Sequence, residues 1–252
     1  MTIYLAGENG KKRILTENED IRSEVNILES FFMLKDDEKT VPLLKQCKNL
    51  FIDSGAFTFI QGTHKKNIDW DEYIVEYANF INKYDIDKFV ELDIERLIGM
   101  DEVLRLRKKL ENLTQKQSIP VWHIERGKED FIKCCKEYPY VAYGSFITDK
   151  IGLSRQEPYI DWFIETAHKY GAKIHGLGYT SLSGLKRHRF DSVDSTAWIA
   201  GSRGGFLYRF KPDTCTFEHL RPAGNVRLKA RESALVNFKE WVKFSNYAEK
   251  YL

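Results

Sequence analysis

Residues 158–178 of the chain read PYIDWFIETAHKYGAKIHGLG and contain a helix, a turn and a strand in succession. Apolar side chains recur in the first part at helical spacing: Ile160, Phe163, Ile164 and Ala167. Most of their neighbours are polar, so the pattern predicts an amphipathic helix over 158–170. The short run 173–178 predicts a strand. Strands that alternate with such helices form βαβ units, in which the strands lie parallel.

The same unit recurs along the chain. Six other short runs predict strands: Ile3–Ala6, Leu50–Asp53, Phe89–Asp93, Val121–Ile124, Tyr140–Phe146 and Phe190–Val193. Further helices are predicted at Trp70–Lys83, Met100–Leu113, Lys128–Glu137, Ser181–His188 and Arg227–Tyr247. Most of the strands lack polar/apolar alternation, as in a parallel sheet that is buried on both faces. Phe206–Phe210 is either an eighth strand or one arm of a late hairpin.

This number of units predicts an α/β fold, a (β/α)₈ TIM-type barrel. We find no internal repeat and no Pro/Gly/Ser-rich linker, which favours a single domain over residues 1–252 with a C-terminal helix packed outside. An open, doubly wound sheet is the alternative. It is disfavoured because no G-x-G-x-x-G follows the first predicted strand.

Composition excludes several classes of protein. Lys+Arg 39 against Asp+Glu 37 gives a net charge of +2, which permits nucleic-acid binding without arguing for it. No stretch approaches the roughly 18 apolar residues of a membrane span, and the first residues lack a signal sequence. We therefore expect a soluble, cytoplasmic protein. The four cysteines are too few and too irregularly spaced for a disulfide framework or a Cys-X-X-Cys zinc site.

Polar residues and glycines follow almost every predicted strand. The strand ends read Asp53-Ser54-Gly55-Ala56-Phe57, Glu91-Leu92-Asp93, His123 with Glu125, Tyr143-Gly144-Ser145, His175-Gly176-Leu177-Gly178, and Asp191 with Asp194. In a (β/α)₈ barrel the carboxyl ends of the strands form the reactive face. One such junction means little, because Asp, Ser and Gly also favour turns. Together they predict a functional pocket with carboxylates from three strands.

The ordered strand ends resemble those of the tRNA-guanine transglycosylase superfamily. Asp53-Ser54-Gly55-Ala56-Phe57 looks like its Asp-Ser-Gly-Gly-Phe/Tyr-Gln motif, and His175-Gly176-Leu177-Gly178 is similar to its Met-Gly-Val-Gly. Phe190-Asp191-Ser192-Val193 resembles its Phe-Asp-Cys-Val, and Tyr143-Gly144-Ser145-Phe146 more weakly resembles its Gly-Gly-Leu strand. The matched segments run from about residue 50 to 196 in the same order. By size, the chain is most like the compact zinc-less members that insert 7-deazaguanines into bacteriophage or bacterial DNA.

This resemblance implies a pentosyltransferase that exchanges a base. Asp191 would attack C1′ of a guanosine and Asp53 would act as general acid/base, which are the two carboxyl roles that displacement at an anomeric carbon requires. Phe57 would stack on the base, and Asp93 would accept hydrogen bonds from its N1–H and exocyclic amine. The remaining implied substrate-binding residues are Ser54, Gly55, His123, Gly144, Ser145, His175 and Gly176. Of these, Gly144 and Gly176 would leave room for the flat heterocycle.

The departures from the family pattern concern metal and substrate. The family's tRNA enzymes carry a zinc site of cysteines and a histidine, where this chain offers only Cys215 and His219, so we expect no metal and no cofactor. The loss favours DNA over tRNA as the partner. A free 7-deazaguanine such as 7-cyano-7-deazaguanine would be the incoming base, and a partner protein is an option for opening the duplex. For a phage-encoded chain the compartment would be the host cytoplasm. The family's base-reading glutamine is replaced by His123 or Glu125.

Several alternatives remain open. Asp194 competes with Asp191 as the nucleophile, and Asp93 is otherwise a salt-bridge partner of Arg96. Other functions are the same exchange on tRNA, a non-catalytic nucleobase- or nucleic-acid-binding barrel, and an unrelated barrel hydrolase of small glycosides or phosphorylated compounds. Basic residues adjoin the predicted pocket and would suit a phosphate backbone: Lys65, Lys66 and Arg203.

Overall fold

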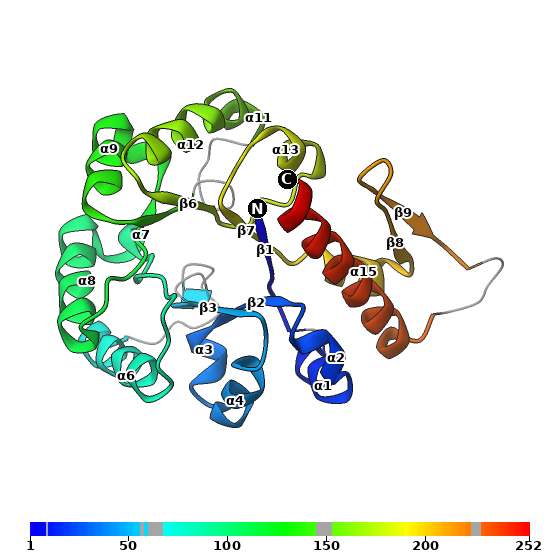
Figure 1. Cartoon of the computed structure of the whole chain (residues 1–252). Helices are drawn as coiled ribbons and strands as arrows, with labels where there is room; N and C mark the ends of the chain where they lie inside the picture. The colour runs from blue at the N-terminus through cyan, green and yellow to red at the C-terminus, as the bar shows by residue number, and fades with distance from the viewer. Residues whose placement is uncertain (9, 56–57, 60–67, 145–152, 223–227) are drawn as a thin grey trace.

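The computed structural model describes residues 1–8, 10–55, 58–59, 68–144, 153–222 and 228–252. Its centre is a curled sheet of parallel strands with helices around the outside (Figure 1). The strands are β1 (Thr2–Leu5), β2 (Asn26–Ser30), β3 (Asn49–Asp53), β4 (Val121–Trp122), β5 (Tyr140–Tyr143), β6 (Lys173–Gly176) and β7 (Ser192–Ser195). They lie in the order β3-β2-β1-β7-β6-β5-β4.

A short segment connects the two edges of this sheet. Phe89 bridges to Ile52 of β3, and Val90 bridges to Ile119 just before β4, both in parallel. The backbone bonds Val90 N–Ile52 O and Ile119 N–Phe89 O are each 2.9 Å long. The pairing of strands therefore continues around the sheet from β3 to β4 through residues 89–90.

The helices cover the outer face of the sheet (Figure 1). They are α1 (Lys11–Glu17), α2 (Glu19–Arg22), α3 (Phe31–Leu34), α4 (Val41–Leu44), α6 (Trp70–Lys83), α7 (Glu95–Ile98), α8 (Met100–Thr114), α9 (Gly127–Glu137), α11 (Leu153–Gln156), α12 (Ile160–Lys169), α13 (Leu182–Arg187), α14 (Trp198–Gly204) and α15 (Ala230–Tyr251), with single 3₁₀ turns at Glu38–Thr40, Ile124–Arg126 and Glu157–Tyr159. None of the described helices is both long enough and apolar enough to cross a lipid bilayer.

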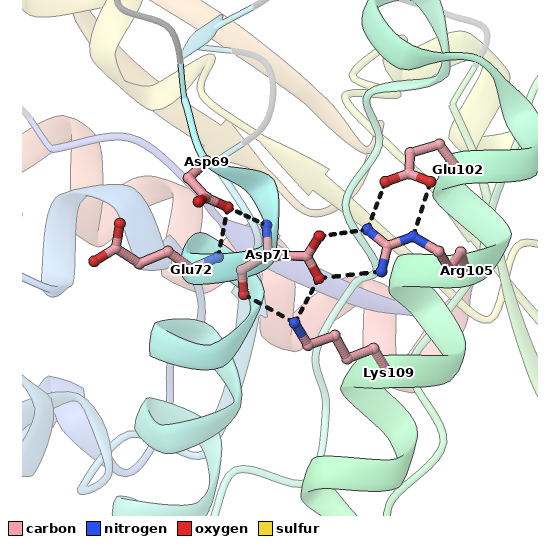
Figure 2. A network of polar contacts seen from close by, with 6 residues as sticks. All are labelled: Asp69, Asp71, Glu72, Glu102, Arg105 and Lys109. Carbon is pink, nitrogen blue, oxygen red and sulfur yellow. Dashed lines mark hydrogen bonds and ion pairs between the residues drawn. The ribbon is translucent and has the colours of Figure 1, made fainter.

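Polar contacts tie two of these helices together at the surface (Figure 2). Asp69 caps α6 by accepting from the backbone N–H groups of Asp71 and Glu72. From α8, Arg105 and Lys109 both bind the carboxylate of Asp71, at 2.6 and 2.5 Å. These side chains are a third to a half exposed, so water and salt screen the network and it contributes little to stability.

Strand β2 was not predicted from the sequence, because three of its five residues are polar. Glu29 forms a buried ion pair with Lys11 of α1 (2.5 Å), and Asn26 donates to Glu249 of α15 (2.8 Å). Partners from elsewhere in the chain thus satisfy the polar side chains of a buried strand, and the local pattern cannot show this.

The structure decides one strand prediction that the sequence left open and corrects another. Phe206–Phe210 belongs to an antiparallel hairpin of β8 (Leu207–Lys211) and β9 (Thr216–Leu220), the second of the two options, and not to the central sheet. The seventh parallel strand does not run over Phe190–Val193. It begins at Ser192 and ends at Ser195, and this shift changes which aspartate lies at its carboxyl end.

The core has two parts. A small cluster fills the inside of the curled sheet: Tyr4, Ala6, Leu28, Phe51, Val90, Ile119, Val121 and Ala142. A larger cluster lies between the strands and the surrounding helices. Helix α15 packs along β1, where Ser245 Oγ donates to the carbonyl of Ile3 at 2.9 Å. Because side chains alternate along a strand, the inward face of each strand can be followed from the inner cluster to its carboxyl end.

Candidate active site

Four predicted site residues and Asp194 lie on the inward face at the carboxyl ends of the strands. Asp53 is two residues beyond the inward Phe51, and Asp194 is in register with the inward Tyr4. His175 is in register with the inward Ala142. His123 and Gly144 follow the inward residues of β4 and β5 by two positions each. We call this end of the sheet the mouth, and the end where the strands begin the floor.

The carboxyl group of Asp53 has a pKa that is raised toward neutral pH. Burial raises its pKa to about 6, and the negative charges of Asp93 and Asp194 act in the same direction. A hydrogen bond from the backbone N–H of Gly55 to Oδ2 (3.0 Å) opposes this rise. A carboxyl group with a pKa near 6 can both give and take a proton near neutral pH. Asp53 and Asp194 share this end of the sheet by strand register.

The turn after Asp53 requires a glycine. Gly55 has a φ of +80°, and a Cβ there would lie 2.4 Å from Cβ of Phe32 and 2.6 Å from Oγ of Ser30. Ser54 is buried, and its carbonyl accepts from the hydroxyl of Tyr73 on α6 at 2.6 Å. Its Oγ has no partner among the described residues. This turn therefore holds Asp53 against the inner face of the sheet.

Asp93 pairs with His123 across the mouth. His123 Nε2 lies 2.8 Å from Oδ1 of Asp93, and the histidine side chain is only 2% exposed against 17% for the aspartate. A Cβ on Gly144 would lie 2.8 Å from Cε1 of His123, so the imidazole occupies the space that a side chain at 144 would take. His123 thus orients Asp93 through Oδ1.

One oxygen of Asp194 has two polar neighbours. Its Oδ1 accepts from the backbone N–H of Gly178 at 2.6 Å, and His175 Nε2 lies 3.3 Å from the same oxygen. Only 11% of the side chain of Asp194 is exposed. Among the described residues these contacts engage Oδ1, so Oδ2 is the oxygen available to a substrate.

The expectation that Asp191 ends a strand at the mouth is wrong. Asp191 precedes β7, and its carbonyl accepts from the N–H of Thr2, where β1 begins. Its Oδ2 accepts from the N–H of Ile174 (2.8 Å) and lies 2.9 Å from Nε2 of His168. All these partners lie at or near the floor, so Asp191 ties the starts of strands together at the opposite end from Asp53. The alternative aspartate, Asp194, is the one at the mouth.

Gly176 also differs from its expected place. It is in register with Tyr143 and Val193, whose side chains belong to the outer core. A Cβ at 176 would lie 3.2 Å from the ring of Phe190 and 3.2 Å from Cβ of Tyr179. The space left by this glycine is therefore used by outer-core packing and not by the mouth.

Other predicted residues lie elsewhere or outside the described part of the chain. Phe57, Ser145, Lys65 and Lys66 are not among the described residues. Arg203 is exposed on α14, which follows β7. Arg221 lies over the ring of Phe206, with its guanidinium carbon 6.0 Å from the ring centre.

The residues that could bind a metal are dispersed. Within the described ranges no group of three or more His, Cys, Asp and Glu side chains is arranged to hold a metal ion. Cys215 is buried, and burial raises the pKa of its thiol. His219 lies on β9 against the ring of Phe206, with ring centres 4.5 Å apart.

Comparison with known proteins supports the fold and goes no further. No family model matches the sequence, and no curated protein matches it. Among solved structures, the chain is similar to a putative fructose-1,6-biphosphate aldolase from Coccidioides immitis, with a TM-score of 0.51 and 11% identity over 99% of this chain and 87% of the other. At this identity the likeness concerns the α/β fold alone. The chain is an α/β protein with a curled parallel sheet and a C-terminal helix.

Proposed function

We propose that this chain is a base-exchange glycosyltransferase, built as a (β/α)₈ barrel, which replaces guanine in DNA with a 7-deazaguanine. The observation that carries the proposal is the convergence of Asp53, Asp93 and Asp194 at the mouth, with the pKa of Asp53 raised to about 6. Two carboxyl groups with different roles are what double displacement at an anomeric carbon needs. A third carboxylate suits the donor edge of guanine.

In the first half-reaction Asp194 is the nucleophile. Its Oδ2 forms a bond to C1′, the bond from C1′ to N9 of guanine breaks, and the electron pair of that bond leaves with the base. Protonated Asp53 gives its proton to the departing guanine. The products are free guanine, a glycosyl ester on Asp194 and an ionised Asp53.

In the second half-reaction the incoming 7-deazaguanine reverses these events. Asp53 takes the proton from its N9, N9 attacks C1′, and the ester bond breaks to release Asp194 as a carboxylate. Both displacements invert C1′, so the configuration is retained overall. Exclusion of water from the mouth during this step would prevent hydrolysis of the glycosyl ester.

Base recognition falls to Asp93. One of its oxygens is held by His123 at 2.8 Å, which leaves the other to accept from N1–H and the exocyclic amine of guanine. Both 7-deazaguanine and guanine present this donor edge, so one site suits the departing and the incoming base. Adenine lacks an N1–H and is disfavoured, because the carboxylate then faces a lone pair.

DNA is the favoured polymer because the chain lacks the zinc site that the family's tRNA enzymes carry. One candidate for the incoming base is 7-cyano-7-deazaguanine. A guanine inside a duplex has to leave the stack to reach the mouth, at a cost of a few kcal/mol that single-stranded substrate reduces. We therefore expect single-stranded DNA to react faster than duplex DNA, unless a partner protein opens the duplex.

The test is to trap the glycosyl-enzyme. The protein is mixed with guanine-containing single-stranded DNA or, separately, with tRNA, and adducts are read on denaturing gels and by mass spectrometry. We expect a DNA adduct in the wild type and in Asp191→Asn, and none in Asp194→Asn. An adduct with tRNA alone assigns the same chemistry to the other polymer. Absence of any adduct or base exchange from folded protein would overturn the proposal and favour a nucleobase-binding barrel.

A further inference from the structure

A chain of buried polar groups runs up the inside of the barrel to Asp194. The hydroxyl of Tyr140 and Oγ of Ser192 are 2.5 Å apart, and Oγ of Ser192 lies 2.5 Å from Nδ1 of His175. On the other side of the ring, Nε2 lies 3.3 Å from Oδ1 of Asp194. The imidazole of His175 is fully buried, with the rings of Tyr4 and Phe51 edge-on at 6.0 and 4.9 Å between centres.

The donors and acceptors of this chain fit one direction. An ionised Asp194 can only accept, so Nε2 of His175 carries a hydrogen. The other nitrogen of a neutral ring is then an acceptor, and the hydroxyl of Ser192 donates to it. Tyr140 in turn donates to Ser192. Burial raises the pKa of Tyr140 to about 12, so its hydroxyl keeps the hydrogen at neutral pH.

We propose that His175 is a positioning residue for Asp194, locked by Ser192 and Tyr140 in the tautomer that donates from Nε2 and so directs Oδ2 of the carboxylate toward the substrate. This inference deepens the proposed function and rests on it for the consequence in catalysis. The carboxylates of Asp93 and Asp194 both act electrostatically on Asp53, so the mouth gathers negative charge. Among these carboxylates, a donor aimed at Oδ1 stabilises the charge that a nucleophile needs.

Two substitutions of His175 separate the effect of its hydrogen bonds from the effect of the volume of its ring. His175→Gln keeps an N–H group that can reach Asp194 and an oxygen that can accept from Ser192. His175→Phe keeps an aromatic ring and removes both polar atoms. We expect His175→Phe to lower the single-turnover rate of adduct formation about 10–100-fold, the effect of one hydrogen bond to a charged group, with little change in KM. His175→Gln should recover most of that loss.

His188→Gln is the matched control. His188 is also buried, and its Nδ1 lies 2.6 Å from a carboxylate oxygen of Asp161, but it follows α13, away from the mouth. Its variant should leave the rate of adduct formation unchanged. If His175→Phe retains the rate and His175→Gln loses it, the ring serves packing and the proposal is wrong.

A spectroscopic readout keeps this test separate from that of the proposed function. Ring ¹⁵N spectra of the wild type at neutral pH should assign the hydrogen to Nε2 of His175, and Ser192→Ala should introduce the other tautomer. A ring protonated on both nitrogens, or on Nδ1 alone, overturns the inference even if the enzyme exchanges bases. Conversely, an Nε2–H ring in a protein that never reacts with nucleic acid refutes the proposed function and leaves the hydrogen-bond assignment standing.

Discussion

Two aspartates with almost the same local contacts lie just before strand β7 and near its carboxyl end. Each carboxylate accepts, on one oxygen, a backbone N–H group and lies within 3.3 Å of Nε2 of a histidine. At the floor the partner of Asp191 is His168, whose side chain is 45% exposed. At the mouth the partner of Asp194 is His175, which is fully buried. The difference between the two sites lies in their surroundings and not in their immediate bonds.

The comparison shows what makes a carboxylate a candidate for catalysis. Asp191 contacts the starts of β1 and β6, and water screens its partly exposed contact with His168. Asp194 lies at the mouth with Asp53, whose pKa burial raises to about 6, and the negative charges of Asp93 and Asp194 act in the same direction. A short motif around residue 191 cannot distinguish these settings, because the two aspartates are only three positions apart, one just before β7 and one within it.

The strongest way to break the comparison is to neutralise each aspartate in turn. Asp194→Asn should lower base exchange by about 10⁴-fold or more, as removal of a nucleophile does, with little effect on folding. Asp191→Asn should keep activity within about threefold and lower the free energy of unfolding by about 1 kcal/mol, because it weakens bonds that join the strand starts. Steady-state kinetics and urea unfolding of both variants measure this. Equal losses of activity would remove the distinction between mouth and floor.

The next test uses pH and Asp53. Glycosyl-enzyme formation needs Asp53 protonated, so its rate should fall about tenfold per pH unit above about 6. The return step needs the ionised form, so its rate should rise with pH and level off above about 6. Single-turnover measurements of each half-reaction should give these opposite profiles. Asp191→Asn should share both profiles with the wild type, and a pair of parallel profiles would contradict the role of Asp53.

Asp53 also links folding to pH. Its pKa in the folded protein lies above the ordinary 3.8, so the folded state binds the proton more tightly than the unfolded state. The contribution of this group to stability therefore increases as pH falls from about 6 to 3.8 and is lost as pH rises again. Asp53→Asn should flatten this part of the stability profile. A profile that stays unchanged in urea unfolding at several pH values would contradict the raised pKa.

Two glycines with similar φ angles, one at each end of the sheet, differ in the packing around them. Gly55 at the mouth has a φ of +80° and no room for a Cβ, whereas Gly171, before β6 at the floor, has a φ of +77° and nothing within 4 Å of a Cβ. Gly171→Ala should lower the free energy of unfolding by about 1 kcal/mol through backbone strain alone. Gly55→Ala should cost about 2–4 kcal/mol, because overpacking adds to the same strain. Equal losses of unfolding free energy in the two variants would mean that the turn after Asp53 can shift to accommodate a Cβ at position 55.

The smallest effect is expected away from both ends. Arg105→Ala removes the exposed contacts with Asp71 and Glu102 (Figure 2) and should change the free energy of unfolding by about 0.2–1 kcal/mol, less at high salt. Activity should not change. A larger loss would show that the α6–α8 contact supports the mouth from outside.

Much of this architecture follows from local patterns. Helix α6 has the bounds that its apolar spacing predicts, and the strand-end argument brings Asp53, Asp93, His123 and His175 to one end of the sheet. Longer-range effects do not follow. Strand β2 is polar in sequence because its partners come from α1 and α15, far away along the chain.

The place of Asp194 was open to an argument from alternation. Ser192 and Asp194 share one face of β7, and Val193 and Ser195 share the other. The apolar Val193 marks the outer face, which assigns Asp194 to the inside. The predicted strand, Phe190–Val193, ends before Asp194, so the alternation was not followed as far as this residue. The contacts of His175 lay beyond sequence reasoning, because they reach Ser192 and Asp194 across from β6 to β7.

The packing of α15 on β1 has a consequence for the order of folding. Strand β1 pairs with β7, and the hydroxyl of Ser245 caps a carbonyl of β1 across a sequence separation of 242 residues. As the chain leaves the ribosome, β1 can pair with β2 early, but it lacks its other neighbour, β7, and the cover of α15 until most of the chain has been made. Such distant contacts slow folding and prolong the exposure of apolar strands. Partly synthesised chains therefore expose apolar strands that can aggregate. We expect chaperones that bind such strands to raise the yield of folded protein.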